Sequence, residues 1–307
     1  MTGIPATQAR VGQLLADAVT RLRESGSESP RLDAELLLGH AVGVDRTAIV
    51  AHPEAPIGAD AAAAFERDLV RRLRGEPVAY IRNVKEFYGL AFSVDSRALI
   101  PRPETEVLVE LALEETVRRL TTAPRPPGTP ALQVADVGTG AGTIVVSLAV
   151  ALRRRGAGAE VSLYATDLAE DALQLAKENA VGHGVADVIA FGIADLLPPG
   201  IPPLDVIVAN LPYVRSDVVP TLPVAASFEP GLALDGGNDG LAIIEMLLRR
   251  LPDALSADGA ALLEIGSDQA DEMRSLVERV LPGWACRVEP DLADHPRVAI
   301  VSRRAVN

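Results

Sequence analysis

The sequence predicts an α/β protein whose larger part is a doubly wound, mostly parallel sheet, preceded by a small helical domain and a β-hairpin linker. Two observations lead to this fold class. From residue 131 onward, short apolar segments alternate with helical patterns, an order typical of a parallel sheet with helices on both faces. Before residue 74, apolar residues recur at the three- and four-residue spacing of amphipathic helices. We therefore expect three parts, at 1–74, 75–98 and 99–307.

The composition is that of an ordinary globular protein, with 48% hydrophobic and 23% charged residues. No apolar run approaches the roughly 18 residues that a membrane-spanning helix needs, and the first residues do not read as a secretion signal. We therefore expect a soluble, cytoplasmic protein without a membrane partner. The single cysteine, Cys286, excludes an internal disulfide and a cysteine metal cluster. The net charge of −13 repels phosphate backbones, which disfavours direct nucleic-acid binding.

Helical periodicity extends over residues 11–73. One helix is expected from about Val11 to Leu22, a second after Ser29-Pro30, and a third from Ala61 to Leu73. His40 and His52 have no acid or cysteine partner at ligand spacing, so we expect ordinary packing or surface roles and no metal site.

The helical pattern stops at Gly75-Glu76-Pro77, and residues 78–94 take the shorter rhythm of a β-hairpin with a turn at Gly89. Four of the nine Tyr and Phe residues lie in this stretch, namely Tyr80, Phe87, Tyr88 and Phe92. They form either a small core that joins two domains or a wall of the active cleft, and the sequence leaves both readings open.

The segment after the hairpin starts the larger domain. Pro101 and Pro103 fix the backbone before a helix expected at Val107 to Leu120, and Glu104 or Thr105 can cap this helix. A loop with four prolines is expected at 121–130.

A glycine-rich turn follows the first strand, Leu132 to Val137, and precedes a helix at Ile144 to Leu152. Its residues are Gly138-Thr139-Gly140-Ala141-Gly142, directly after Asp136 and Val137. Alternate glycines permit positive φ and close approach of a ligand, while the free amides at the helix start favour negative charge. A dinucleotide fingerprint would require glycine at position 143, where the chain has threonine, so a compact adenosyl ligand fits better.

The remaining strands are expected at 160–166, 188–193, 205–208 and 260–265, and the tail at 286–290 and 297–302 forms a terminal hairpin. Helices are expected at 172–180, 241–251 and 269–281.

Polar residues stand at the carboxyl ends of these strands, where doubly wound sheets bind ligands. Asp167 is placed to accept hydrogen bonds from two ribose hydroxyls, although it could equally cap the next helix. Asp195, followed by Leu196, is a candidate acceptor for an adenine amino group, or a turn acid. Asn210-Leu211-Pro212-Tyr213 after the fourth strand is the candidate reaction site, although Asn and Pro are also ordinary turn residues.

Taken together, these residues resemble the HemK/PrmC family, the S-adenosylmethionine-dependent methyltransferases that modify a glutamine side chain in peptide chain release factors. The resemblance runs nearly from end to end and rests on 31–38, 75–77, 86–89, 100–106, 136–142, 210–213, 229–230, 235–241, 264–266 and 291–292.

The resemblance implies a Rossmann-like methyltransferase sheet of seven strands, S-adenosyl-L-methionine as cofactor, and a peptide chain release factor as protein substrate, with the glutamine of its GGQ motif as acceptor. It implies that Gly138 to Gly142, Asp167 and Asn210 contact the methyl donor, and that Asn210 to Tyr213 hold the glutamine. It also implies that the helical domain helps bind the release factor. The family's usual Asn-Pro-Pro-Tyr is here Asn-Leu-Pro-Tyr, and Asn83 stands where such proteins usually have glycine.

The chemistry supports this role for Asn210 to Tyr213. An amide nitrogen is a poor nucleophile because its lone pair is delocalised, so positioning must supply the rate. The Asn210 side-chain oxygen and the Leu211 carbonyl can each accept one amide hydrogen, Tyr213 can stack on the amide plane, and Pro212 stiffens the turn. No basic residue is then required.

Three alternatives remain open. The same tetrapeptide type serves methylation of the adenine amino group in DNA or RNA, which the acidity disfavours. Leu211 supports a diverged enzyme that acts on another peptide or on a small-molecule nitrogen. A non-catalytic interaction module would not bind the donor.

Overall fold

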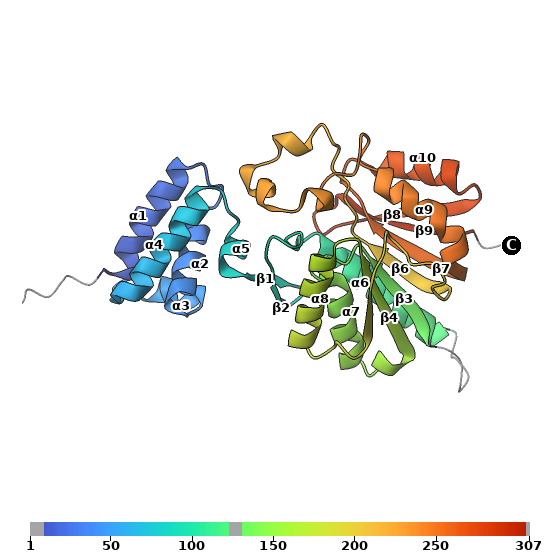
Figure 1. Cartoon of the computed structure of the whole chain (residues 1–307), viewed down its shortest axis with the longest axis horizontal. Coiled ribbons are helices and arrows are strands. Elements are labelled where there is room, and N and C mark those ends of the chain that lie inside the picture. The colour runs from blue at the N-terminus through green and yellow to red at the C-terminus, as the bar shows by residue number, and fades with distance from the viewer. Residues whose placement is uncertain (1–8, 123–130, 305–307) are drawn as a thin grey trace, which may run out of the picture. The chain divides into compact units, whose positions relative to one another are not determined.

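The computed structural model describes residues 9–122 and 131–304 (Figure 1). The described residues up to Val84, together with Pro223–Phe228, form one compact unit, and the others form a second. No helix in the described ranges is long and apolar enough to cross a membrane.

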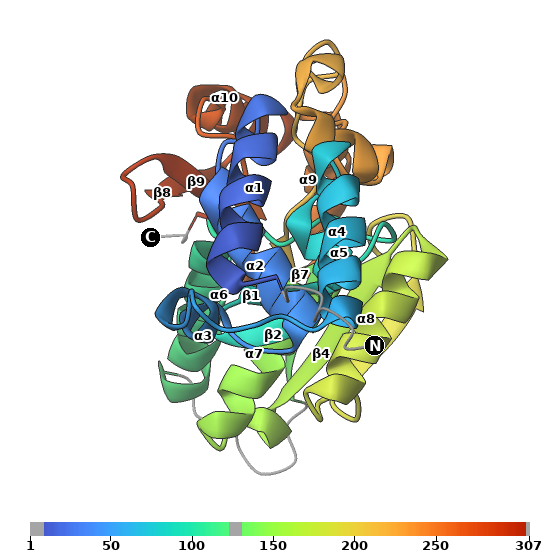
Figure 2. The ribbon, with the colours of Figure 1, turned by 90° about the vertical axis from the view of Figure 1, so that its left-hand side faces the viewer.

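The first unit is helical, as its periodicity predicts. It contains α1 (Val11–Glu24), α2 (Pro30–Val42), α3 (Arg46–Ala51), α4 (Ala59–Leu73) and α5 (Val78–Arg82). Helix α2 packs against α1 and α4 (Figure 2), and buried side chains such as Leu22, Leu37 and Phe65 fill the space among them. The sequence analysis did not predict α3, whose N-cap Asp45 accepts a hydrogen bond from the Ala48 amide at 2.8 Å.

The prediction of hairpin structure from residue 78 is wrong for its first residues, because Val78–Arg82 form the short helix α5. This helix ends at Asn83, whose φ of 55° is left-handed. Asparagine tolerates this conformation better than most residues with a side chain, which explains how it can end the helix without a glycine. The hairpin itself consists of β1 (Val84–Phe87) and β2 (Leu90–Ser93), with Gly89 in the turn as expected.

The hairpin's two phenylalanines favour the packing interpretation of its aromatic residues. Phe87 and Phe92 are buried, and their rings meet edge to face at 6.1 Å.

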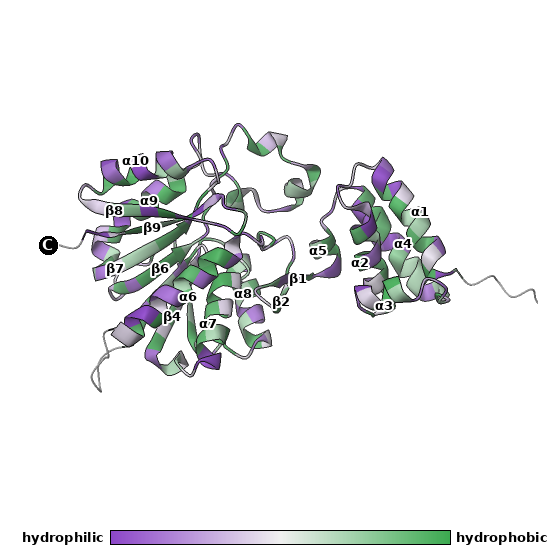
Figure 3. Cartoon of the chain, turned by 180° about the vertical axis from the view of Figure 1, so that it is seen from behind, coloured by the Kyte–Doolittle hydropathy of each residue, from purple (hydrophilic) through white to green (hydrophobic). Residues whose placement is uncertain are grey.

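The second unit contains the predicted α/β sheet. In the described part of the chain its seven strands have the order β5-β4-β3-β6-β7-β9-β8, in which β9 is antiparallel to both neighbours. The strands are β3 (Leu132–Val137), β4 (Val161–Asp167), β5 (Ile189–Ile193), β6 (Leu204–Ala209), β7 (Leu255–Glu264), β8 (Trp284–Pro290) and β9 (Pro296–Arg303). The central strands are largely hydrophobic (Figure 3), because helices cover both their faces.

Helices α6 (Thr105–Thr122), α7 (Thr143–Arg154) and α8 (Glu170–Gly182) cover one face of the sheet (Figure 1). Helices α9 (Ala242–Ala254) and α10 (Ala270–Val280) cover the other, where a core cluster joins them to alternate residues of the strands. Short 3-10 helices lie at Gly158–Glu160, Val219–Thr221, Val224–Phe228 and Gly231–Ala233. Thr121 and Thr122 belong to α6, and the rest of the predicted loop at 121–130 lies outside the described residues.

Candidate active site

Parallel pairing brings the predicted site residues to one edge of the sheet. Val137 of β3 is level with Thr166 of β4 and Ala209 of β6, and Asp167 is level with Ile193 of β5. The glycine turn, Asp167 and Asn210 therefore start from neighbouring positions at the carboxyl edge. The chain moves from β3 to β4 and β5 on one side and then to β6 on the other, so β3 and β6 flank the point where the strand order reverses. Doubly wound sheets bind ligands at this point.

The turn that contains Gly138, Gly140 and Gly142 has positive φ at all three glycines, with values of 73°, 54° and 78°. Residues with a β-carbon rarely adopt this conformation. The amides of Gly138 and Thr139 both donate to the Thr166 carbonyl, at 2.8 and 2.9 Å, which ties the turn to β4. Among the described residues other than its chain neighbours, only Ala98 would lie within 4 Å of a β-carbon added to Gly140, at 3.9 Å. The middle of the turn thus leaves room beside its backbone.

Asp136, at the base of the turn, is fully buried. Its Oδ2 accepts hydrogen bonds from the Thr139 hydroxyl at 2.7 Å and the Val145 amide at 3.2 Å. Its Oδ1 has no hydrogen-bond partner among the described residues. Burial, together with the negative charge of Asp167, raises the pKa of Asp136 to about 7, against the effect of the two donors. Asp136 is therefore a buried acceptor with unused capacity.

Asp167 holds the turn as well as ending β4. Its Oδ2 accepts from the Gly140 amide at 2.8 Å, and its Oδ1 accepts from the Ala169 amide at 2.9 Å. The helix-cap alternative is not realised, because the N-cap of α8 is Ala169. A carboxylate has about four acceptor positions, so Asp167 keeps capacity for ribose hydroxyls.

Asp195 and Leu196 lie after β5. The Asp195 carboxylate is exposed and forms an ion pair with Arg250 at 3.0 Å, so one of its oxygens is already engaged. Leu196 is buried, has a φ of 64°, and its carbonyl accepts from the Thr166 hydroxyl at 2.6 Å. The role of Asp195 at an adenine amino group stays a prediction.

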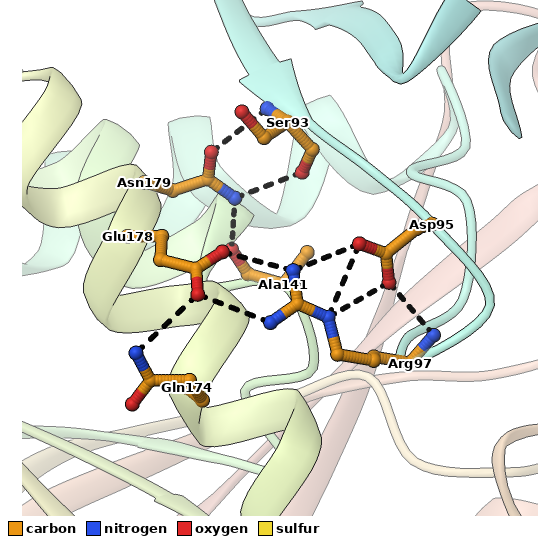
Figure 4. Close-up of polar contacts among 7 residues, drawn as sticks. All are labelled: Ser93, Asp95, Arg97, Ala141, Gln174, Glu178 and Asn179. Carbon is orange, nitrogen blue, oxygen red and sulfur yellow. Dashed lines mark hydrogen bonds and ion pairs between the residues drawn. The ribbon is translucent and has the colours of Figure 1, made fainter.

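The hairpin end is fixed to the glycine turn and to α8 through one asparagine (Figure 4). Asn179 is buried; it accepts from the Ser93 amide and donates to the carbonyls of Ser93 and Ala141, at 2.8, 3.0 and 2.9 Å. Beside it, Arg97 forms ion pairs with Asp95 and Glu178, each at 2.8 Å. These contacts hold the segment that follows β2 against the turn.

Asn210 directly follows β6, and its Nδ2 donates to the hydroxyl of Thr105 at 3.1 Å. Within the described residues, neither the Asn210 Oδ1 nor the Leu211 carbonyl accepts a hydrogen bond. Leu211 is buried, and a β-carbon on Gly138 would come within 2.9 Å of its Cδ2. The candidate reaction loop therefore packs directly on the glycine turn and keeps two neighbouring oxygens without partners.

The segment that contains Leu234 and Gly236 packs against the end of the Asn210–Tyr213 loop. Val214 exchanges backbone hydrogen bonds with Leu234 and Gly236, at 3.1 and 2.8 Å. A β-carbon on Gly236 would lie 2.6 Å from the Pro212 carbonyl oxygen, so only glycine fits there. This close approach explains one glycine of the Asp235-to-Leu241 motif.

Tyr213 is partly buried, and its hydroxyl donates to Glu264 Oε1 at 3.3 Å. Burial is the main cause that raises the pKa of Tyr213 to about 12, so the phenol keeps its proton. Glu264, the last residue of β7, is 1% exposed, and burial raises its pKa to about 7. A cavity of about 570 Å³ also borders Tyr213, with Arg215, Asp268 and Gln269 in its wall.

The sequence patterns do not predict the contacts of Thr105 and Glu264. Thr105 is predicted only as a helix cap, and Glu264 is only part of a motif shared with the family. Glu264 ends a buried strand as Asp167 does, so the same positional rule could have selected it. Glu229 was missed too: it is buried and accepts from Arg102 at 2.7 Å and from the Ile100 amide at 3.2 Å.

The chain is similar to known proteins in sequence and in fold. Residues 13–82 match the family model of the PrmC N-terminal domain. The release factor glutamine methyltransferase of Moorella thermoacetica is 39% identical over 95% of this chain and 98% of its own length, and that of Deinococcus radiodurans is 38% identical over the same shares.

Solved structures similar to this chain include the release-factor-specific protein-(glutamine-N5) methyltransferase of Alicyclobacillus acidocaldarius. It is 29% identical over 69% of this chain and 99% of its own length, with a TM-score of 0.38. The hMettl16 catalytic domain, at 14% identity and a TM-score of 0.52 over 75% of this chain and 81% of its own, shares the fold. With relatives of this identity over nearly its whole length, the chain belongs to the family of release factor glutamine methyltransferases.

Proposed function

We propose that this enzyme transfers a methyl group from S-adenosyl-L-methionine to the side-chain amide nitrogen of a glutamine in a peptide chain release factor, the glutamine of its GGQ motif. The observation that carries the proposal is the Asn210 loop. It presents two oxygens, from Asn210 and Leu211, that have no partner in the described ranges and lie directly beside the glycine turn. The helical unit contributes to binding the release factor, and such an acceptor places the reaction in the cytoplasm.

The residues at the sheet edge fit the methyl donor. Asp136 offers a buried oxygen that has no partner in the part of the chain that the structure describes, and the turn has room beside Gly140. The donor carries positive charge on its sulfonium and ammonium groups, which two neighbouring carboxylates, Asp136 and Asp167, favour. Gly138 to Gly142 with Asp136 would hold the methionyl part, Asp167 the ribose, and Asp195 with Leu196 the adenine.

The protein's part in the reaction is positioning. When bound, S-adenosyl-L-methionine supplies an electrophilic methyl group. The Asn210 Oδ1 and the Leu211 carbonyl each accept one hydrogen of the glutamine amide, which aims the nitrogen's remaining lobe at the methyl. Orientation of this kind supplies about 7–11 kcal/mol in good cases. As the nitrogen–carbon bond forms and the carbon–sulfur bond breaks, the amide becomes cationic and acidic, so water takes its extra proton.

The direct test is incubation of the protein with labelled donor and a release factor, followed by mass spectrometry of the acceptor. We expect one methyl group on the GGQ glutamine. A release factor in which this glutamine is replaced by alanine is the matched control and should stay unlabelled. Labelling of another residue, or of nucleic acid instead, would overturn the proposed acceptor.

Replacement of Asp167 by alanine should weaken donor binding. The loss of an acceptor for two ribose hydroxyls costs about 1–3 kcal/mol, which is roughly fivefold to a little over a hundredfold in Kd. Isothermal titration with the donor measures it. Because Asp167 also holds the Gly140 amide, Asp167→Asn, which keeps one acceptor oxygen, serves as the control and should lose less. A Kd unchanged in Asp167→Ala would place the ribose elsewhere.

Replacement of Leu211 by proline should preserve or raise activity on a release factor. Proline fixes φ near −65° and keeps the carbonyl that accepts the amide hydrogen. Within the described residues the Leu211 amide donates no hydrogen bond, so proline removes none. We expect kcat/KM at least about one third of the wild-type value, and higher if the loop becomes better ordered.

The opposite result, a loss of activity in Leu211→Pro, would favour another acceptor. The Leu211 side chain packs on Gly138, and this packing could instead shape a pocket for a different substrate. A loss of activity on the true substrate in Leu211→Pro would support that reading. If neither form methylates a release factor while both bind the donor, the enzyme has a diverged acceptor.

A further inference from the structure

Glu264 is a buried carboxyl group that has no role in the positioning mechanism described above. Its Oε1 accepts from the Tyr213 hydroxyl, and its Oε2 has no hydrogen-bond partner among the described residues. The Thr105 hydroxyl lies close enough to this carboxyl to lower its pKa, against the larger effect of burial. Thr105 and Glu264 are both buried, and each contacts the reaction loop, Thr105 through Asn210 and Glu264 through Tyr213.

The hydroxyl of Thr105 has one hydrogen to give. Its oxygen already accepts from Asn210 Nδ2, at 3.1 Å, so its own hydrogen needs a different acceptor. The Glu264 carboxylate accepts and, when ionised, cannot donate. If the hydroxyl hydrogen points at Glu264, the hydroxyl oxygen can only accept from Asn210.

This order decides which end of the Asn210 side chain meets the substrate. With Nδ2 engaged at Thr105, the Oδ1 is turned to the acceptor side, where an amide hydrogen needs it. If the Thr105 hydrogen pointed at Asn210 instead, the side-chain amide would be favoured in the flipped orientation. It would then present two donors to an amide that is itself a donor.

We infer that Glu264 and Thr105 are positioning residues: the Thr105 oxygen accepts from the Asn210 side-chain amide, its hydroxyl hydrogen turns toward the acceptor of Glu264 that has no partner among the described residues, and this order holds the Asn210 oxygen toward the substrate amide. The inference deepens the proposed function and rests on it. Glu264 has a second effect, since the same carboxylate accepts from Tyr213. The buried Glu264 carboxylate therefore orients two side chains of the reaction loop, Asn210 through Thr105 and Tyr213 directly.

Ionisation of Glu264 should control this arrangement. The groups that act on it are the hydroxyls of Thr105 and Tyr213, the cation of Arg297 on β9, and the anion of Glu104 before α6. Burial dominates and raises its pKa to about 7. The carboxylate is then present above pH 7 and is lost below it. Protonated Glu264 can donate to Thr105, which releases the Thr105 hydrogen to Asn210, so the transfer rate should fall as the pH falls below about 7.

The kinetic experiment compares two buried threonines of α6. Thr105→Val removes the hydroxyl and should lower the single-turnover rate with a release factor about 10- to 100-fold, with the donor Kd within about twofold of wild type. Thr105→Ser restores a hydroxyl and should recover most of the rate. Thr116→Val is the matched control, because Thr116 is equally buried but its hydroxyl donates to the Ala112 carbonyl of its own helix. It should leave turnover unchanged.

Glu264→Gln tests the acceptor itself. Its amide can donate to Thr105 and should lower the rate about as much as Thr105→Val does. It should also remove the fall in rate below pH 7.

A second measurement needs neither donor nor acceptor. The chain has five asparagines, so asparagine labelled with ¹⁵N gives few side-chain signals in NMR, and Asn210 is assigned by its absence in Asn210→Ala. We expect the Asn210 signals to shift with a midpoint near pH 7, and not to shift in Glu264→Gln. Asn83, in the other unit, is the internal reference. The pKa of Asp136 is also raised to about 7. A shift of the Asn210 signals that disappears in Glu264→Gln is therefore caused by Glu264 and not by Asp136.

The outcomes separate this inference from the proposed function. If Thr105→Val methylates a release factor as fast as Thr116→Val, the positioning role is wrong while the function stands. A titration of Asn210 that persists in Glu264→Gln would also overturn it. If the wild type methylates no release factor, the NMR titration still decides the inference. Should Glu264→Gln fail to fold, the threonine pair and the Asn210 titration in Thr105→Val decide it.

Discussion

Asn210→Ala should lower the single-turnover rate of methyl transfer at least about 100-fold, which corresponds to about 2.7 kcal/mol in the activation barrier. The variant removes one of the two oxygens that hold the acceptor amide, and the nitrogen is then free to turn away from the methyl. Misplacement of reacting groups by about 1 Å can cost this much. The donor should bind with nearly unchanged affinity, because the glycine turn and Asp167 remain.

Asn210→Gln is the informative comparison. It keeps the amide but moves it by one methylene, so a positioning role predicts a loss of similar size. If the glutamine variant were near wild type, the presence of an amide would matter and its position would not. A rate for Asn210→Ala within about two- or threefold of wild type would contradict the proposed geometry. Titration with the donor provides the check that the fold is intact.

The central strands β3, β4, β6 and β7 could be predicted because each is a short, mostly apolar run with a glycine or a polar residue at or directly after its end. β3, for example, is mostly apolar, apart from Gln133 and Asp136, and then meets the glycine turn, and β6 is apolar from Val206 to Ala209 and then meets Asn210. Strand ends of a parallel sheet share one edge, so these two sites could be placed side by side from the sequence alone.

The contacts behind the site could not be predicted in the same way. Thr105 and Asn210 are 105 residues apart in the chain, and no periodicity connects them. The spacing of glycines in the sequence also does not reveal which neighbouring atoms a β-carbon at each position would approach too closely. Gly236 leaves room for the Pro212 carbonyl, and Gly75 leaves room for Val224, whose Cγ1 would lie 2.6 Å from an added β-carbon. Only the packed structure shows these approaches.

The short helix α5 shows a limit of pattern recognition. Its five residues are too few for a helical period, and a short apolar run with valine, tyrosine and isoleucine resembles a strand. The helix ends in a left-handed residue at Asn83, which a search for glycine alone overlooks.

Gly142→Ala should destabilise the second unit by about 2–5 kcal/mol. Two costs add. Alanine at a φ of 78° costs about 1–2 kcal/mol, and its β-carbon would lie 2.9 Å from the β-carbon and 3.1 Å from the α-carbon of Ala176 in α8. Overpacking of this kind costs about 1–3 kcal/mol. Ala176 is completely buried, so it has little freedom to move.

Gly156→Ala separates the two costs. Gly156 has nearly the same φ, 75°, but in the described part of the chain no atom beyond its chain neighbours would lie within 4 Å of its added β-carbon. It should therefore lose only the conformational share, about 1–2 kcal/mol. Urea unfolding followed by the fluorescence of the single tryptophan, Trp284 in β8, reports on the sheet of the second unit. Equal losses in the two variants would mean that α8 moves away from the turn at little cost. In that case the close contact with Ala176 would not be the reason for glycine at position 142, and the two variants should bind the donor with similar affinity.

If the contact with Ala176 does require glycine, Gly142→Ala should bind the donor more weakly than Gly156→Ala does. The added β-carbon would displace the turn, and the turn's backbone would then no longer lie where the donor needs it.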